Sequence, residues 1–177
     1  MLFYIIRIIN VSNRGDNLAL QHEFVFVSNE KKGLDFIGID WIELCFLYKE
    51  EATIDECVVL SDELIVYLLD FTHLIPTYYP AKRAEGFGIH YYGITKIEQQ
   101  GAVIAEQLFC SLVNMLSLAP ETIELTGQFQ WENDNNTDGE YERYVFDRDK
   151  LCQDLNSFIR LLCRVKNGEG YILHYGI

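Results

Sequence analysis

Basic side chains are scarce in this chain. Its 177 residues include 14 lysines and arginines against 27 aspartates and glutamates, which gives a formal net charge of −13. Nucleic acids and anionic membrane surfaces are bound mainly through lysine and arginine, and a surplus of carboxylates is repelled by both. The charge balance therefore argues against nucleic acid and against a membrane surface as direct partners.

Long apolar runs are also missing. The longest charge-free apolar run in the middle of the chain, residues 64–69, is far shorter than the roughly 18 residues that a membrane-spanning helix needs. The apolar opening, residues 1–7, has neither a basic segment before it nor a small-residue cleavage site after it, so it predicts a first strand and not a secretory signal. We expect no membrane span.

The cysteines lack the spacing of a metal or redox motif. There are five of them, an odd number, and none forms a C-x-x-C pair. Free cysteines are among the most frequently buried residues, so we expect reduced thiols and a cytoplasmic location.

Apolar residues, by contrast, are plentiful. Hydrophobic residues make up 49% of the chain and aromatic residues 14%, which is enough to fill a core and excludes disorder as the default state. The length suits one domain or two small ones.

The second half of the chain begins with a strand pattern followed by a helix. Residues 86–94 are rich in aromatic and branched side chains, which is typical of a strand. Thr95 and Glu98 have the spacing of a capping box and predict the start of a helix, which Pro120 ends. The apolar stripe of this helix is predicted to comprise Ile97, Ile104, Leu108, Leu112 and Met115.

The same order continues with a hairpin, a second helix and a last strand. Residues 122–132 and 140–146 have strand patterns and flank a polar loop, and Asp147 can cap a helix that ends near Gly168. Its apolar stripe is predicted to comprise Leu151, Leu155, Phe158, Leu162 and Val165. Residues 171–175 form a final strand. The sequence therefore predicts an α+β fold, an antiparallel sheet with helices on one face, with residues 86–177 in βαββαβ (ferredoxin-like) order.

The first 80 residues are less regular. Residues 2–11, 23–28 and 34–39 have strand patterns, 41–48 fit a strand or a buried helix, and Ser61 opens a helix that reaches about Phe71. Two of the three prolines lie in residues 75–83, which favours a linker there. We predict an N-terminal lobe, 1–80, and a C-terminal lobe, 86–177; the sequence leaves open whether they form one continuous domain.

No recognised catalytic motif is present. The loop 134–139 matches the first half of an EF-hand calcium loop, but Val145 stands where the bidentate glutamate is needed. Gly86 and Gly88 begin a dinucleotide fingerprint whose third glycine is replaced by Tyr91. We expect no metal and no cofactor, and we incline against an enzyme.

Carboxylates gather in two windows of the sequence. Eight of the 27 lie between Asp40 and Glu63, beside a single base, and seven lie between Glu121 and Glu142 with no base. Aromatic anchors amid like charge are typical of surfaces that bind a partner of opposite charge. The candidate partner-binding residues are Trp131, Glu132, Asp134, Asp138, Glu140, Tyr141 and Glu142.

These features favour a small, non-catalytic, bacterial-type interaction protein with an acidic surface that binds a basic protein. A toxin-neutralising immunity protein is one form of this hypothesis, because carboxylates placed over the cationic cleft of a nuclease compete with its substrate. The alternative is a small-molecule enzyme or ligand-binding protein with a site near His90, Tyr91, Tyr92, His174 and Tyr175. A third interpretation, self-association through an open sheet edge, is left open by the sequence.

Overall fold

The computed structural model describes residues 20–30, 48–50, 52–131 and 139–177. Several predictions fall outside these ranges: the strands over 2–11 and 34–39, the segment 41–47, and the candidate partner-binding residues Glu132, Asp134 and Asp138. Within the described ranges, every helix is too short or too polar to span a lipid bilayer.

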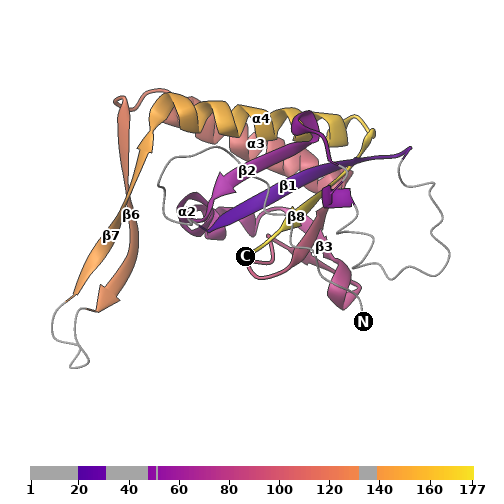
Figure 1. Cartoon of the computed structure of the whole chain (residues 1–177), viewed down its shortest axis with the longest axis horizontal. Coiled ribbons are helices and arrows are strands. Elements are labelled where there is room, and N and C mark those ends of the chain that lie inside the picture. The colour runs from indigo at the N-terminus through magenta and orange to yellow at the C-terminus, as the bar shows by residue number, and fades with distance from the viewer. Residues whose placement is uncertain (1–19, 31–47, 51, 132–138) are drawn as a thin grey trace.

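A six-stranded antiparallel sheet forms the body of the protein (Figure 1). Its strand order is β2-β1-β8-β5-β3-β4, and every neighbouring pair is antiparallel. The strands are β1 (Gln21–Ser28), β2 (Cys57–Ser61), β3 (Pro76–Tyr79), β4 (Ala84–Phe87), β5 (Ile94–Ile97) and β8 (Gly170–Tyr175). Short 3₁₀ turns, Ile54–Glu56 and Pro80–Lys82, precede β2 and β4.

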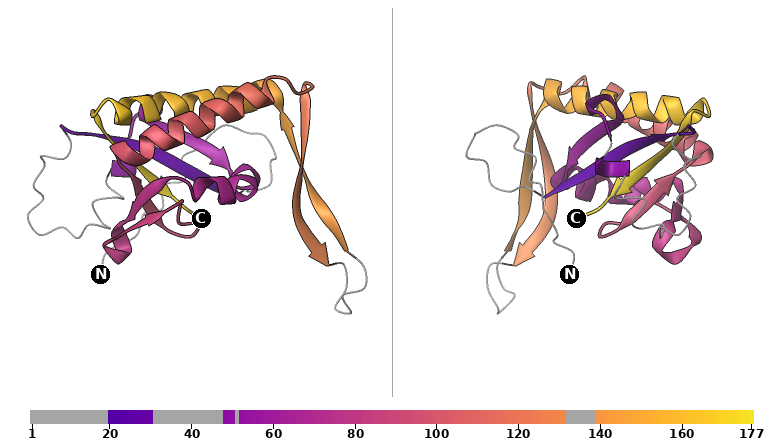
Figure 2. Two further views of the ribbon diagram at one scale, coloured as in Figure 1. Left: turned by 180° about the vertical axis from the view of Figure 1, so that it is seen from behind. Right: turned by 45° about the vertical axis from the view of Figure 1, so that its right-hand side comes forward.

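Two long helices lie side by side on one face of this sheet. They are α3 (Gln99–Leu116) and α4 (Arg148–Lys166), and the shorter α2 (Asp62–Thr72) contributes to the same core (Figures 1 and 2). Phe158 of α4 joins the layers, since its ring centroid lies 4.5 Å from that of Phe24 on β1 and 4.9 Å from that of Phe109 on α3. The predicted α+β class, an antiparallel sheet with helices on one face, is confirmed.

The remaining two strands leave the body. They are β6 (Thr122–Trp131) and β7 (Gly139–Asp147), which pair only with each other among the described strands and project as a long twisted hairpin from one end of the helices (Figures 1 and 2). We call this hairpin the arm. The ferredoxin-like order of the C-terminal half is not confirmed: β5 and β8 are neighbours, as that order requires, but the middle two strands are not in their sheet.

The predicted strand 86–94 is divided. It ends as β4 at Phe87 and resumes as β5 at Ile94, because Gly88 adopts a φ of 80° and its N–H donates to the carbonyl of Ile75, which turns the chain away. His90 and Tyr91 therefore lie in a loop, residues 88–93, and not on a strand. The predicted capping box is also wrong: Thr95 is buried within β5, and α3 begins at Gln99 after Glu98.

Other predicted helix starts are confirmed. The side chain of Asp147 accepts a hydrogen bond from the Lys150 N–H at 2.7 Å, and Ser61 caps α2 through the Leu64 N–H at 3.4 Å. Strands from both predicted lobes share the main sheet, since β1 and β2 precede residue 80 and β5 and β8 follow it. The segment predicted as a linker contains β3.

Candidate functional site

An exposed aromatic cluster lies toward the end of the arm. The ring of Phe129 contacts those of Trp131 and Tyr141 edge-to-face, with centroid distances of 4.9 and 5.0 Å. These side chains are 39%, 57% and 56% exposed, respectively. A Cβ at Gly139 would meet the Phe129 ring, so the glycine leaves room for this packing. Large aromatic groups that pack on one another yet stay exposed are typical of a protein-binding surface.

Glu140 and Glu142 of the arm lie on the other side of the same ladder from the aromatic cluster. Side chains alternate along a strand, so Tyr141 points to one side and Glu140 and Glu142 to the other. Glu142 accepts hydrogen bonds from Gln130 at 3.1 Å and from the Tyr144 hydroxyl at 2.8 Å. Both partners are neutral, so these contacts hold the carboxylate in place without cancelling its charge.

A cleft of about 840 Å³ separates the arm from the body. It lies between the start of α2, the strand β7 and the start of α4. Its acidic lining residues are Asp62, Glu63, Glu142, Asp147 and Asp154, and its basic ones are Arg143 and Lys150. Asp62 and Glu63 come from the first acidic window of the sequence and Glu142 from the second, so the fold brings part of both windows together.

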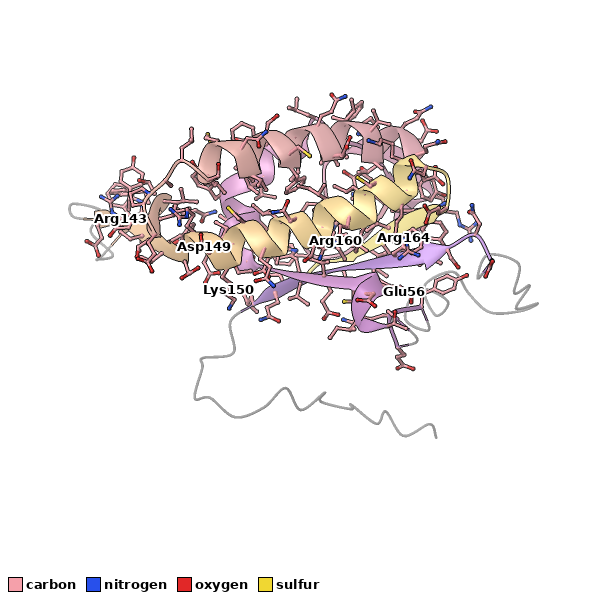
Figure 3. The ribbon with its side chains drawn as sticks, turned by 90° about the horizontal axis from the view of Figure 1, so that it is seen from above. Glu56, Arg143, Asp149, Lys150, Arg160 and Arg164 are labelled. Carbon is pink, nitrogen blue, oxygen red and sulfur yellow. The ribbon has the colours of Figure 1, made fainter. Side chains whose placement is uncertain are left out.

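The basic residues of β7 and α4 that Figure 3 labels lie in two places, beside the cleft and toward the far end of α4. Figure 3 shows Arg143 on the arm and Lys150 at the start of α4, whereas Arg160 and Arg164 lie toward the other end of that helix. Arg164 pairs with Glu169 at 3.2 Å.

Within the cleft, burial raises the pKa of Asp154, and the positive charge of Lys150 opposes that shift. The cleft therefore retains more carboxylates than the cations that line it can offset.

Behind the cleft, a buried hydrogen-bond network connects the helix α2 to the centre of the sheet. His22 Nε2 lies 3.1 Å from Asp62 Oδ1, and His22 Nδ1 lies 2.8 Å from His174 Nε2. The hydroxyl of Tyr91 donates to the same Asp62 oxygen at 2.5 Å. Both histidines are fully buried, whereas the Asp62 side chain is 20% exposed. Asp62 is thus the point at which this network meets the cleft.

Burial, and after it hydrogen bonds and neighbouring charges, shifts the pKa values of the network's members and of Tyr144 on the arm. Burial, followed by the hydrogen bond to Asp62, raises the pKa of Tyr91. Burial, followed by the charges of His22 and His90, lowers the pKa of His174 to about 3. The pKa of Tyr144 is raised by burial, by its hydrogen bond to Glu142 and more weakly by the Asp62 charge. The two tyrosine–carboxylate pairs, one on the body and one on the arm, therefore lie within electrostatic range of each other.

The structure brings together only part of the predicted histidine site. Tyr91 and His174 belong to one network, but Tyr92 is 75% exposed and Tyr175 is buried on the opposite face of the sheet. The strand partners of His174 are Phe24 and Thr95, not His90. Among the described residues, no three His, Cys, Asp or Glu side chains are grouped so as to hold a metal ion.

Sequence reasoning missed His22 and Asp62. The predicted strand begins at residue 23, and His22 lies one position before it, on the same side of β1 as Phe24 and Phe26. Asp62 directly follows Ser61, which predicts the helix start, and is one of eight carboxylates in the first acidic window. Their contact joins positions 40 residues apart, and no local pattern carries that information.

Comparisons of the chain with protein-family models, with curated proteins and with solved structures found no match.

Proposed function

We propose that this protein binds a basic protein partner through the arm and the adjoining acidic cleft. The observation that carries the proposal is the meeting of carboxylates from two distant windows of the sequence, Asp62 and Glu63 with Glu142, in one cleft at the base of an arm that exposes an aromatic cluster. The chain as a whole has a net charge of −13, which attracts a cationic protein over long range.

The two parts of this surface suit different steps of binding. Carboxylates that are not cancelled by nearby cations steer a basic partner and increase the association rate. Exposed aromatic rings that become buried in a complex supply most of the affinity and slow dissociation. Phe129, Trp131 and Tyr141 pack on one another before binding, so little side-chain entropy is lost when a partner covers them.

A cationic nuclease toxin is the kind of partner that fits this chemistry, with the present chain acting as its immunity protein. A phosphate-binding cleft must be basic, and an acidic protein that covers it excludes the nucleic acid. The charge of the chain, the acidic cleft and the projecting arm support this form of the proposal. Purification of the tagged chain from its native host, followed by identification of the bound proteins, names the partner for the measurements below.

Loss of the aromatic cluster is expected to weaken binding strongly. Replacing Trp131 and Tyr141 by alanine removes two exposed rings, and the dissociation constant for the purified partner should rise about 100-fold, mainly through faster dissociation. Surface plasmon resonance measures both rates. The matched control replaces Phe71 and Phe87, which are 53% and 61% exposed on the body and do not line the cleft, and should bind like wild type. An equal loss of affinity in both variants would show that the arm is not part of the binding interface.

Reversal of the arm carboxylates is expected to slow association. Changing Glu140 and Glu142 to lysine should lower the association rate constant about tenfold at low ionic strength, because steering depends on charge, and the difference should shrink as salt is added. The control reverses Glu30 and Glu85, which changes the net charge equally at other exposed sites. Unchanged association kinetics in the arm variant would contradict the proposal.

The alternative site around His90 and His174 is less well supported. His174 is fully buried and its Nε2 is engaged by His22, so a ligand could reach it only if the core opened. A ligand in the cleft would meet Asp62 instead.

A further inference from the structure

The network behind the cleft joins four segments that are distant in the sequence. Asp62 is the first residue of α2, His22 and His174 lie on the neighbouring strands β1 and β8, and Tyr91 lies in the loop between β4 and β5. The two imidazole rings are stacked, with centroids 5.1 Å apart and an interplanar angle of 9°. Asp62 and the histidine pair therefore tie the start of α2 and the loop 88–93 to the middle of the sheet.

The hydrogen bonds fix where the protons must lie. A carboxylate accepts, so His22 Nε2 carries the proton shared with Asp62 Oδ1, and the neutral His22 then offers Nδ1 as an acceptor. His174 Nε2–H donates to it. His174 Nδ1 is left as a bare acceptor, and this atom is buried without a hydrogen-bond partner. In this tautomer the buried nitrogen without a partner is an acceptor, and no N–H donor is left unpaired.

One more proton cannot be accommodated in this arrangement. If it binds His174 Nδ1, it creates a buried N–H donor that faces no acceptor. If it binds His22 Nδ1, His174 Nε2 must become the acceptor, so His174 changes to its other tautomer. The proton of His174 then lies on Nδ1, which again is a buried donor without a hydrogen-bond partner. Leaving a buried donor unpaired is costly in either case. The neutral pair fits the closed structure, and the protonated pair does not.

We propose that the His22–His174 pair is an acid-sensitive latch, which holds the start of α2 and the loop 88–93 on the sheet when both imidazoles are neutral and releases them when the pair takes up one additional proton. The loop it holds also has hydrogen bonds of its own to the body: Gly88 N–H donates to the Ile75 carbonyl at 2.9 Å, the Thr77 hydroxyl donates to the Gly88 carbonyl at 2.7 Å, and His90 N–H donates to the Thr95 hydroxyl at 2.7 Å. Asp62 N–H donates to the Leu20 carbonyl at 3.1 Å, and the loop accepts from Gly176 and Ile177 at 3.0 and 3.1 Å.

The groups that face the pair are consistent with such a latch. Asp62 approaches from α2, Tyr91 and His90 from the loop, and the uncharged Phe24 and Thr95 from β1 and β5. Burial and the neighbouring imidazoles lower the pKa of His174 to about 3. Because this pKa lies below the ordinary value of 6.5, the closed state binds fewer protons than the open one, and acid favours opening.

The latch also reaches the surface assigned to the partner. Asp62 lines the cleft, and α2 contacts β6 of the arm, so release would alter the cleft. This consequence rests on the proposed function. The latch itself does not, and the experiments below measure it without a partner.

Hydrogen exchange of the whole chain tests the latch. Between pH 7.5 and pH 5.0, the opening equilibrium of the latch should rise about 30-fold, as expected for one site whose pKa is ordinary when open and strongly lowered when closed. Protection factors, corrected for intrinsic exchange, should fall by that factor at the amides of α2 and of Gly176 and Ile177. Amides at the centres of α3 and α4 should keep their protection. A uniform fall, or none at all, would overturn the proposal.

The variant His174→Gln is the matched control. Its amide nitrogen can donate to His22 Nδ1 as the imidazole does, and it does not titrate, so the pH dependence at α2 should disappear. An unchanged pH dependence in this variant would exclude the histidine pair as its origin.

A second measurement uses the wild-type chain alone and does not depend on how the variant folds. Nitrogen-15 NMR of the imidazoles reports protonation and tautomer directly. His174 should remain neutral, protonated at Nε2 and bare at Nδ1, from pH 7.5 to pH 5.0 in the closed state. Protonation of His174 near its ordinary pKa while the α2 amides stay protected would contradict the latch.

Discussion

Replacement of Phe158 by alanine is expected to lower the free energy of unfolding by about 4 kcal/mol, because large-to-small substitutions at buried aromatic sites lose both transfer energy and packing. Phe158 is 1% exposed and contacts Phe24 of β1 and Phe109 of α3. It therefore holds both helices to the sheet. A domain of this size is typically stable by about 5–15 kcal/mol, so this single change threatens the fold.

Urea unfolding followed by circular dichroism measures the effect. The control is Leu118→Ala, at a position 86% exposed, which should stay within about 0.5 kcal/mol of wild type. Comparable losses in the two variants would show that Phe158 is not the centre of the core. A change in the denaturant slope would instead mark a less compact native state or partial unfolding.

Replacement of His22 by alanine is expected to lower the free energy of unfolding by about 3 kcal/mol. The substitution strands the His174 Nε2–H in the interior, removes a donor from Asp62 and opens a cavity between β1 and α2. An unsatisfied buried donor alone costs about 1–3 kcal/mol, and the cavity adds to that. Urea unfolding at pH 7.5 is the measurement.

The matched comparison for His22 is His73, which is exposed at the end of α2 and has one ring nitrogen 2.9 Å from the Leu69 carbonyl. His73→Ala should lower stability by less than about 1 kcal/mol. If His22→Ala were equally mild, the buried network would be dispensable for the fold, and its role as a latch would lose its structural basis.

Helix α4 shows how much local pattern alone can predict. Leu151, Leu155, Phe158, Leu162 and Val165 recur at helical spacing, and all of them are buried. Its first residue follows Asp147, whose side chain caps it as predicted. Periodicity and capping are local properties, and in α4 the tertiary packing agrees with both.

Helix α3 was predicted with the correct type but with an inaccurate start and face. Ile104 and Met115 of the predicted stripe are 38% and 59% exposed, and the buried side instead includes Ala105, Phe109 and Leu116. An apolar residue does not reveal which side of a helix faces its neighbour when both sides carry several. The choice was made by packing against α4 and the sheet.

The candidate site also has a part that the sequence predicts and a part that depends on the folded structure. Their position amid charge predicts Trp131 and Tyr141 as aromatic anchors, and the structure places both of them more than half exposed on the arm. The separation of Tyr141 from Glu140 and Glu142 follows from the alternation of side chains along β7. The contribution of Phe129 depends instead on the register of β6 on β7, which places Phe129 opposite Tyr141.

The sequence by itself determined the α+β class, the order of most elements beyond residue 80, the face of α4 and the excess of negative charge, because composition and short-range periodicity are written along the chain. Only the tertiary structure decided that β6 and β7 leave the sheet as an arm, that Asp62 and Glu142 share a cleft, and that His22 meets His174 from a position 152 residues away. Such contacts depend on which surfaces bury the most area together and which buried polar groups find partners, and those are properties of the folded whole.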